Sequence, residues 1–421
     1  ELMVPKYVFE MKLSLLQRVA LSENGAQQLL QHNLIESLGD MDVLHEGVNL
    51  EPGEVDMGSS LPSAEQRYHD VLIPTLSLVV TVLGGCGKSH DALTRVGHFV
   101  MKHRDIFSHI LQDKGQRITL ASLEALKWLT AIFAYLAGDR KAMEKPIGST
   151  NYGSLLVALL NKYMSPSKWE SKLHTTNEVE VERKELSAQF LGRPSAMSLF
   201  RQDAEKHVQE ICRNLLSYCT GVTTVPAPER FLPLFDFSFE GADLDGRAGS
   251  STNKAPSLGS ICRYAANHME ALLRALDDYQ NVSNKLLDVE SLPLDEINEI
   301  IRAAENSMSE VGPSHKRQWA RLELRRAEKE KRKQAALFLY ALEHTLLLIW
   351  RHLKLLAINP NVAGSTTRGA LGDLKVQIGE VLGPVLQKVD GLGLIEGIKY
   401  SGDLDFLKPT ARKLQDLLVE G

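Results

Sequence analysis

The sequence has few of the residues and patterns that mark enzymes, metal proteins and disulfide-rich proteins. Aromatic residues make up 6% of its 421 residues, and its four cysteines form no CxxC pair. Neither HExxH nor GxSxG occurs, which excludes the common zinc-hydrolase and serine-hydrolase signatures. We therefore predict no catalytic, cofactor-binding or metal-binding residues. The cysteine spacing also favours unpaired thiols in a reducing compartment.

A strong excess of one charge and a long apolar run are also missing. The formal net charge is −5, which provides no general attraction to nucleic acid or to an anionic membrane. The longest apolar run, residues 335–350, contains Glu343 and His344 and falls short of the roughly 20 residues that span a bilayer. We expect a buried helix there, no transmembrane segment and no direct nucleic-acid partner. The opening ELMVPKYVFEMK has no signal-type apolar core, and we interpret the sequence as part of a longer chain.

What the sequence does contain is helical periodicity. In residues 118–137, Leu123, Leu126 and Ile132 recur on one helical face, and Trp128 and Ala131 recur on another. A helix that is apolar on two faces needs neighbours on both sides. Residues 91–111 form a second amphipathic pattern, so the two segments predict a helical hairpin. A chain of such hairpins predicts an all-α fold: an irregular α-solenoid of armadillo- or HEAT-like hairpins with one very long helix.

Composition divides the chain into three predicted parts. Residues 1–219 form the N-terminal half of the solenoid, and Gly25 in its first hairpin allows close packing. Residues 220–258 are rich in Pro, Phe and Gly and predict an irregular crossover. Residues 259–421 form the C-terminal half, including the long helix 313–357. We also predict one helix over 184–218, interrupted near 192–194, a solvated acidic loop over 39–60, and a non-helical segment over 402–409.

Residues 76–89, LSLVVTVLGGCGKS, come nearest to a catalytic motif. Gly87-Lys88-Ser89 resembles a phosphate-binding loop, but the glycine required five positions earlier is Val82, whose branched side chain obstructs the turn. The surrounding segments are helical in pattern, so no strands are available for a parallel sheet. We favour a helix–turn–helix over a nucleotide hydrolase that uses Lys88.

Residues 315–333, HKRQWARLELRRAEKEKRK, contain nine Lys or Arg residues against three Glu residues. Such a run can meet RNA, an acidic lipid surface or an acidic partner. Both signs recur at helical spacing over 323–333, which is typical of a solvated long helix. We favour the solvated helix.

The long helix near the end of the chain has more apolar surface than the two helices that follow it can cover. Part of this surface must be core, but a solenoid end without a polar cap accepts a helix from a partner. The predicted partner-binding residues are Phe338, Leu342, Leu346, Ile349, Trp350, Leu404 and Phe406. The alternative, that Phe406 belongs to the core, stays open.

Three segments, HDVLIPTLSLVVTVLGG, VGHFVMKHRDIF and ITLASLEALKWLTAIFAYLAG, resemble the C-terminal part of the large scaffold nucleoporins of the inner ring of the nuclear pore complex. The resemblance extends from GAQQLLQHNLIESL to the long helix. It implies a helical stack without enzyme activity, located in the nuclear envelope. It also implies binding to short amphipathic helical segments of linker nucleoporins and to other inner-ring nucleoporins, which anchors the transport channel. No Phe is followed by Gly, so the chain carries none of the FG repeats of the barrier nucleoporins.

A soluble transport receptor of the karyopherin kind is the alternative function. Those receptors are also acidic helical solenoids, but their hairpins are more regular. The long helix and the crossover argue against that class. Release of a partner by the GTP-bound GTPase Ran would indicate a receptor and not a scaffold.

Overall fold

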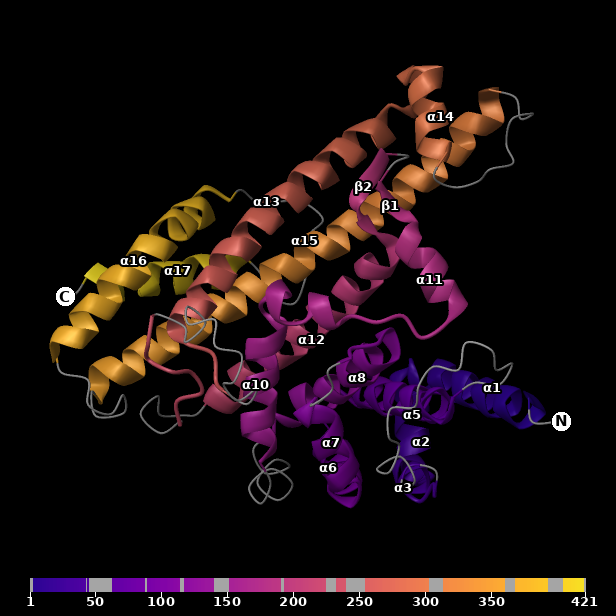
Figure 1. The fold of residues 1–421 in the computed structure, drawn as a ribbon, viewed down its shortest axis with the longest axis horizontal. Coiled ribbons are helices and arrows are strands. Elements are labelled where there is room, and N and C mark those ends of the chain that lie inside the picture. The colour runs from indigo at the N-terminus through magenta and orange to yellow at the C-terminus, as the bar shows by residue number, and fades with distance from the viewer. Residues whose placement is uncertain are drawn as a thin grey trace. The chain divides into compact units, whose positions relative to one another are not determined.

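The structure is a computed structural model that describes residues 3–42, 44, 63–87, 89–113, 117–139, 151–190, 193–224, 232–239, 254–302, 313–359, 368–392 and 404–419. Apart from one two-stranded hairpin, the regular structure in these ranges is helical, which confirms the predicted all-α, solenoid-like fold (Figure 1). Two compact units are present. Unit 1 comprises residues 1–177, 206–236 and 242–256, and unit 2 comprises residues 178–205, 237–241 and 257–421.

The elements of unit 1 are α1 (Met3–Ala20), α2 (Glu23–Gln31), α3 (Leu34–Gly39), α5 (Ala64–Cys86), α6 (His90–Lys102), α7 (Arg104–Gln112), α8 (Leu120–Leu136), α10 (Tyr152–Tyr163) and the short 3-10 helices η2 (Pro166–Lys168) and η3 (Glu170–Lys172). Unit 2 contains α11 (Glu178–Glu185), β1 (Ser187–Phe190), β2 (Arg193–Ser198), α13 (Leu258–Leu287), η6 (Val289–Ser291), α14 (Leu294–Arg302), α15 (Pro313–Ile358), α16 (Arg368–Gly391) and α17 (Leu404–Val419). Residues 199–205 of α12 (Leu199–Thr223) belong to unit 2 and the rest to unit 1. The three-part division predicted from composition stays a prediction.

Helix α8 contributes many side chains to the core of unit 1. It begins with a capping box, in which the Ser122 amide donates to Thr119 Oγ1 at 3.1 Å and the Thr119 amide donates to Ser122 Oγ at 3.0 Å. Leu123 and Ile132, nine residues apart, are buried on opposite sides of the helix. Its most extensive packing is against α5. The predicted helix is therefore confirmed, and of its second predicted face Ala131 is buried while Trp128 is half-buried.

The predicted single helix over 91–111 is wrong in one respect, because the structure breaks it at His103 into α6 and α7. His103 is buried, its Nε2 lies 3.1 Å from the carbonyl oxygen of Gly39, and its ring packs 5.0 Å from that of Phe99. These contacts come from α3 and from the last turn of α6. Helical periodicity continues across the break, so the sequence pattern does not reveal it.

The predicted helix over 184–218 is also wrong in its first third. A β-hairpin precedes α12: β1 and β2 pair antiparallel, with Gln189 opposite Pro194 and Phe190 opposite Arg193. Proline removes a backbone donor and pushes the preceding residue into extended conformation. Arg193-Pro194 therefore ends the helical pattern altogether where we predicted an interruption.

Helices α13 and α15 lie side by side in unit 2 (Figure 1). They run antiparallel: the ring of His268 on α13 contacts Phe338 on α15, and ten residues further along α13 Asp278 pairs with Lys331 at 2.6 Å. Helix α15 has 46 residues, which confirms the predicted long helix. Its second half is apolar nearly all round, and both α13 and α17 pack against this helix.

Helix α5 is the one helix in the described part of the chain with the length and hydropathy of a membrane span. In the structure it packs against α1, α2, α6 and α8. Gly85 makes that packing possible. A Cβ at Gly85 would lie 2.4 Å from the Ala20 carbonyl oxygen and 2.6 Å from Ala26 Cβ. We interpret α5 as a core helix of unit 1.

Gly85 and its neighbour Gly84 allow a stability test. Gly85→Ala is expected to lower the free energy of unfolding by about 1–3 kcal/mol, because backbone and a short side chain must move apart. Gly84→Ala is the matched control, since a Cβ there meets only the Tyr135 hydroxyl at 3.4 Å. A glycine inside a helix is about 0.5–1 kcal/mol less stable than alanine, so the control should be neutral or stabilising. Urea unfolding of both variants measures the difference, and equal stability would contradict the close approach.

Candidate partner-binding surface

The predicted partner-binding residues of α15 lie mostly inside unit 2. Four of them, Phe338, Leu342, Leu346 and Ile349, are buried, as is their neighbour Leu353. Helix α13 packs along this stretch, as the contact of Phe338 with the His268 ring shows. A buried side chain cannot touch a partner while the unit keeps this packing. In this fold these residues lie beneath the surface and support it, and only their exposed neighbours can contact a partner.

Trp350 is half-buried and marks the edge of that surface. The Nζ atoms of Lys354 and Lys413 lie 5.1 Å and 5.5 Å from the centre of its ring. Both ammonium groups are therefore within cation–π range of the indole. Because Lys413 belongs to α17, this contact joins α15 to α17 at the surface.

The predicted non-helical segment 402–409 is wrong for its second part, since α17 begins at Leu404. Pro409 lies inside α17. As the sixth residue of the helix it removes one intrahelical hydrogen bond, and the helix continues beyond it to Val419. The helix turns Leu407 into the core and leaves Phe406 69% exposed. Of the two alternatives that the sequence left open for Phe406, the structure shows the outward-facing ring, and a helix presents it.

Helical spacing aligns Phe406 with two exposed neighbours on α17. Pro409 and Lys413 follow at three and seven residues, and both are exposed. With Lys413 beside Trp350, the row continues onto α15. We define the α15–α17 surface as Trp350, Lys354, Phe406, Pro409 and Lys413. It combines two aromatic rings with two ammonium groups, which suits a helix that is apolar on one side and acidic at its edge.

Sequence reasoning missed a second apolar surface, on α1. Tyr7, Met11, Leu15 and Val19 recur every four residues and are all exposed, whereas Leu13 and Ala20 are buried on the other side. The signal was present, because α1 is apolar on two faces while its neighbours α2 and α5 cover only one. Rows spaced by four residues are the ridges that pack against another helix.

The catalytic alternative finds no support in the described residues. Helix α5 runs without interruption through Val82, where a phosphate-binding loop would need a strand and a turn. Lys88 lies outside the described residues. Within the described ranges, no group of three His, Cys, Asp or Glu side chains is placed to hold a metal ion.

Comparison with known proteins bears on the identity of the chain. The sequence model of the Nup192 family, described as the nuclear pore complex scaffold nucleoporins 186/192/205, matches residues 1–137. Nuclear pore complex protein Nup205 of Homo sapiens is 24% identical over 376 residues, which cover 83% of this chain and 18% of that protein. Nup205 of Drosophila melanogaster is 22% identical over 389 residues, which cover 88% of this chain and 17% of that protein. The chain thus spans less than a fifth of the length of these relatives.

The family match falls on unit 1, where the segments that carried the sequence resemblance lie. The two relatives extend the similarity over most of the chain, unit 2 included. The helical stack agrees with the fold that the resemblance implied. Together, the matched sequence and the helical architecture show that the chain is similar to the scaffold nucleoporins 186/192/205 of the nuclear pore complex.

Proposed function

We propose that the chain is a scaffold segment of the nuclear pore complex, without enzyme activity, that binds a short amphipathic helix of a linker nucleoporin on the α15–α17 surface. The family match and the two nuclear pore complex relatives support the scaffold role and the location in the nuclear envelope. The single observation that carries the binding site is the exposed Phe406 ring beside the Trp350–Lys413 contact.

The chemistry of the α15–α17 surface selects the partner. A partner helix would place apolar side chains at i, i+3, i+4 and i+7 over Phe406 and Pro409. Acidic side chains at its edge would meet the ammonium groups of Lys354 and Lys413. The buried residues Leu346 and Ile349 hold α15 in place beneath this surface. Such a partner adds one more helix to a stack of helices, which is how a solenoid end extends.

Phe406→Ala is expected to weaken binding of the linker helix at least about thirtyfold. An aromatic anchor at the centre of an interface typically contributes about 2–4 kcal/mol, and the lower value corresponds to that factor. The free energy of unfolding should change by no more than about 0.5 kcal/mol, because the ring is exposed. Titration calorimetry with synthetic peptides, each spanning one helical segment of a linker nucleoporin, measures the affinity.

Val179→Ala on α11 is the control, because Val179 is, like Phe406, an exposed apolar residue of unit 2. Its side chain is 63% exposed. It should bind the same peptide with unchanged affinity. If Phe406→Ala binds as tightly as the unsubstituted chain, the site lies elsewhere. If Phe406→Ala unfolds at a much lower temperature than the Val179 variant, Phe406 acts as core and not as an anchor.

A further inference from the structure

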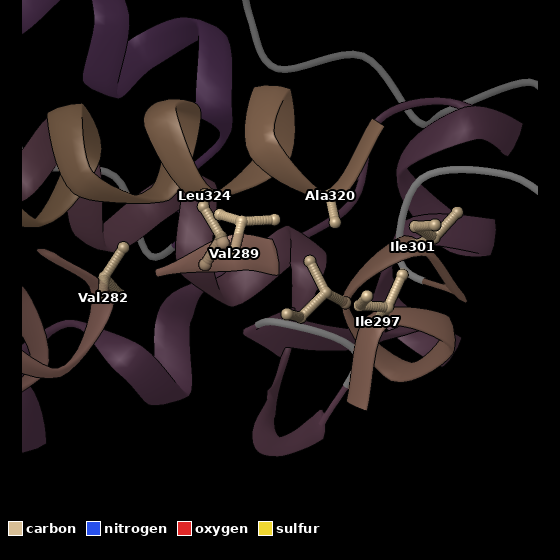
Figure 2. Packing of buried hydrophobic residues seen from close by; sticks show 7 residues of the cluster. Val282, Val289, Ile297, Ile301, Ala320 and Leu324 are labelled. Carbon is tan, nitrogen blue, oxygen red and sulfur yellow. The ribbon is translucent and has the colours of Figure 1, made fainter. Parts of the chain in front are cut away.

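The first half of α15 is held rigidly by a small core of its own. Val282, Val289, Ile297, Ile300, Ile301, Ala320 and Leu324 form a buried hydrophobic cluster (Figure 2). Ala320 and Leu324 come from α15, and the other members come from α13, η6 and α14. One face of this part of α15 is therefore committed to packing, and the orientation of the opposite face is determined.

The opposite face is exposed and basic. Trp319, Leu322, Arg326, Lys329 and Lys333 follow one another at steps of three and four residues, which places them in one row along the helix. Trp319 is 36% exposed, Leu322 is 54% exposed, and the three basic side chains are also exposed. The row begins with two apolar residues and continues with cations.

Ion pairs neutralise only part of the positive charge on this helix. Arg317 and Arg321 share Glu290, and Lys331 pairs with Asp278. Five further cations make no ion pair with any described residue: Arg325, Arg326, Lys329, Arg332 and Lys333. Residues 325–333 span about 12 Å at 1.5 Å per residue. Over that length Glu330 is exposed and Glu328 is half-buried, so the five cations outnumber the acidic residues and the surface is positive in a chain whose net charge is −5.

We propose that this row, the α15 basic face, binds the headgroups of an anionic lipid surface. Each Lys or Arg near such a surface contributes about 1 kcal/mol of attraction, and Trp and Leu insert at the boundary between headgroups and acyl chains. The face is the outer side of a straight helix packed on its own unit, and it fits a flat charged surface. A single-stranded nucleic acid would need several aromatic side chains along a groove, whereas one tryptophan lies here at the end of the row.

Vesicle flotation tests the proposal directly. The full chain is mixed with vesicles of phosphatidylcholine containing phosphatidylserine, and in parallel with vesicles of phosphatidylcholine alone. We expect binding to the first and not to the second, and loss of binding as salt is raised. The triple variant Arg326→Glu, Lys329→Glu and Lys333→Glu should bind at least about a hundredfold more weakly. Loss of three cations at about 1 kcal/mol each corresponds to that factor.

The control variant carries the same change of charge elsewhere: Lys12→Glu, Arg18→Glu and Lys184→Glu, three exposed cations of α1 and α11. It should float as the unsubstituted chain does, and both triple variants should keep the circular dichroism spectrum of the unsubstituted chain. Trp319→Ala should weaken binding while leaving the salt dependence in place.

Several outcomes would overturn the proposal. These are no flotation of the unsubstituted chain, equal flotation of the α15 triple variant, or equal loss in the control. Binding of single-stranded RNA or an acidic peptide through the α15 basic face, without vesicle binding, would assign it to another class of partner.

Discussion

Acidification from about pH 7 to about pH 5 is expected to lower the free energy of unfolding of unit 2 by about 5 kcal/mol. Three histidines cause this effect. Burial lowers the pKa of His268, of His344 and of His352 to about 4, from an ordinary value of 6.5. The Arg351 guanidinium further lowers the pKa of His344 and of His352. The free energy of unfolding of a domain is typically about 5–15 kcal/mol, so a loss of this size is a large part of the total stability.

The same local arrangement recurs at the three histidines. Each Nδ1 lies within 2.7–3.0 Å of the carbonyl oxygen four residues earlier, that of Tyr264, Tyr340 or Leu348. A neutral ring donates that hydrogen bond, and aromatic rings replace water around two of them, with Tyr264 and Tyr340 both 3.8 Å away between ring centres. Protonation would place a charge on the fully buried His352 ring and on the partly buried rings of His268 and His344.

The sign of the pH effect follows from the protons bound. Between pH 6.5 and about 4 the unfolded state binds protons at these histidines and the folded state does not. Stability is therefore complete above pH 6.5 and falls as the pH is lowered through that window, by about 2 kcal/mol per histidine at pH 5. His352→Leu removes one of the three groups and should reduce the slope of unfolding free energy against pH by about a third. Urea unfolding at a series of pH values measures it.

His315→Gln is the control, because His315 is an exposed residue at the start of the same helix, α15. It should leave the slope unchanged. A chain whose stability is the same at both ends of the window would show that these rings are solvated in the folded state.

Leu346→Ala is expected to lower the free energy of unfolding by about 2–5 kcal/mol. The Leu346 side chain is fully buried between α15 and its neighbours in unit 2. Removing three carbon atoms loses their burial and leaves a cavity, since a packed helix pair closes only partly around it. Thermal or urea unfolding measures the loss.

Leu322→Ala makes the same substitution on the same helix at an exposed position. It should change the unfolding free energy by no more than about 0.5 kcal/mol. If Leu346→Ala kept full stability and instead weakened the linker helix, Leu346 would belong to the binding surface and not to the core beneath it.

Most helices could be predicted from the sequence because helical periodicity is a local property. The long helix and α8 follow from the spacing of their own side chains and from nearby caps. The break at His103 could not be predicted, since its cause is the carbonyl oxygen of Gly39, far away in sequence. The hairpin at 187–198 was missed for a different reason. Arg193-Pro194 indicated a break in the helix. The pairing of β1 with β2 could not be predicted, because periodicity within a segment does not show which segment it pairs with.

The candidate site divides in the same way. The sequence identified the apolar surplus at the end of the chain, and it left open whether Phe406 faces outward or belongs to the core. It could not distinguish Leu342 and Leu346, which are core, from an accessible groove. A helix that is apolar all round gives the same pattern whether its neighbour comes from its own chain or from a partner. The exposed row on α1 was missed because periodicity alone does not show which apolar face of a helix has a neighbour.

By itself, the sequence determined the helical class, the length of α15, the absence of common catalytic motifs and the resemblance to scaffold nucleoporins. These properties depend on residue type and on spacing within one helix. Only the tertiary structure decided which apolar faces are covered. It placed α13 over Leu346, left Phe406 and the α1 row exposed, and turned the α15 basic face away from the core. The physical reason is that burial of a side chain depends on which helix lies opposite, and that neighbour is chosen by contacts between residues far apart in the chain.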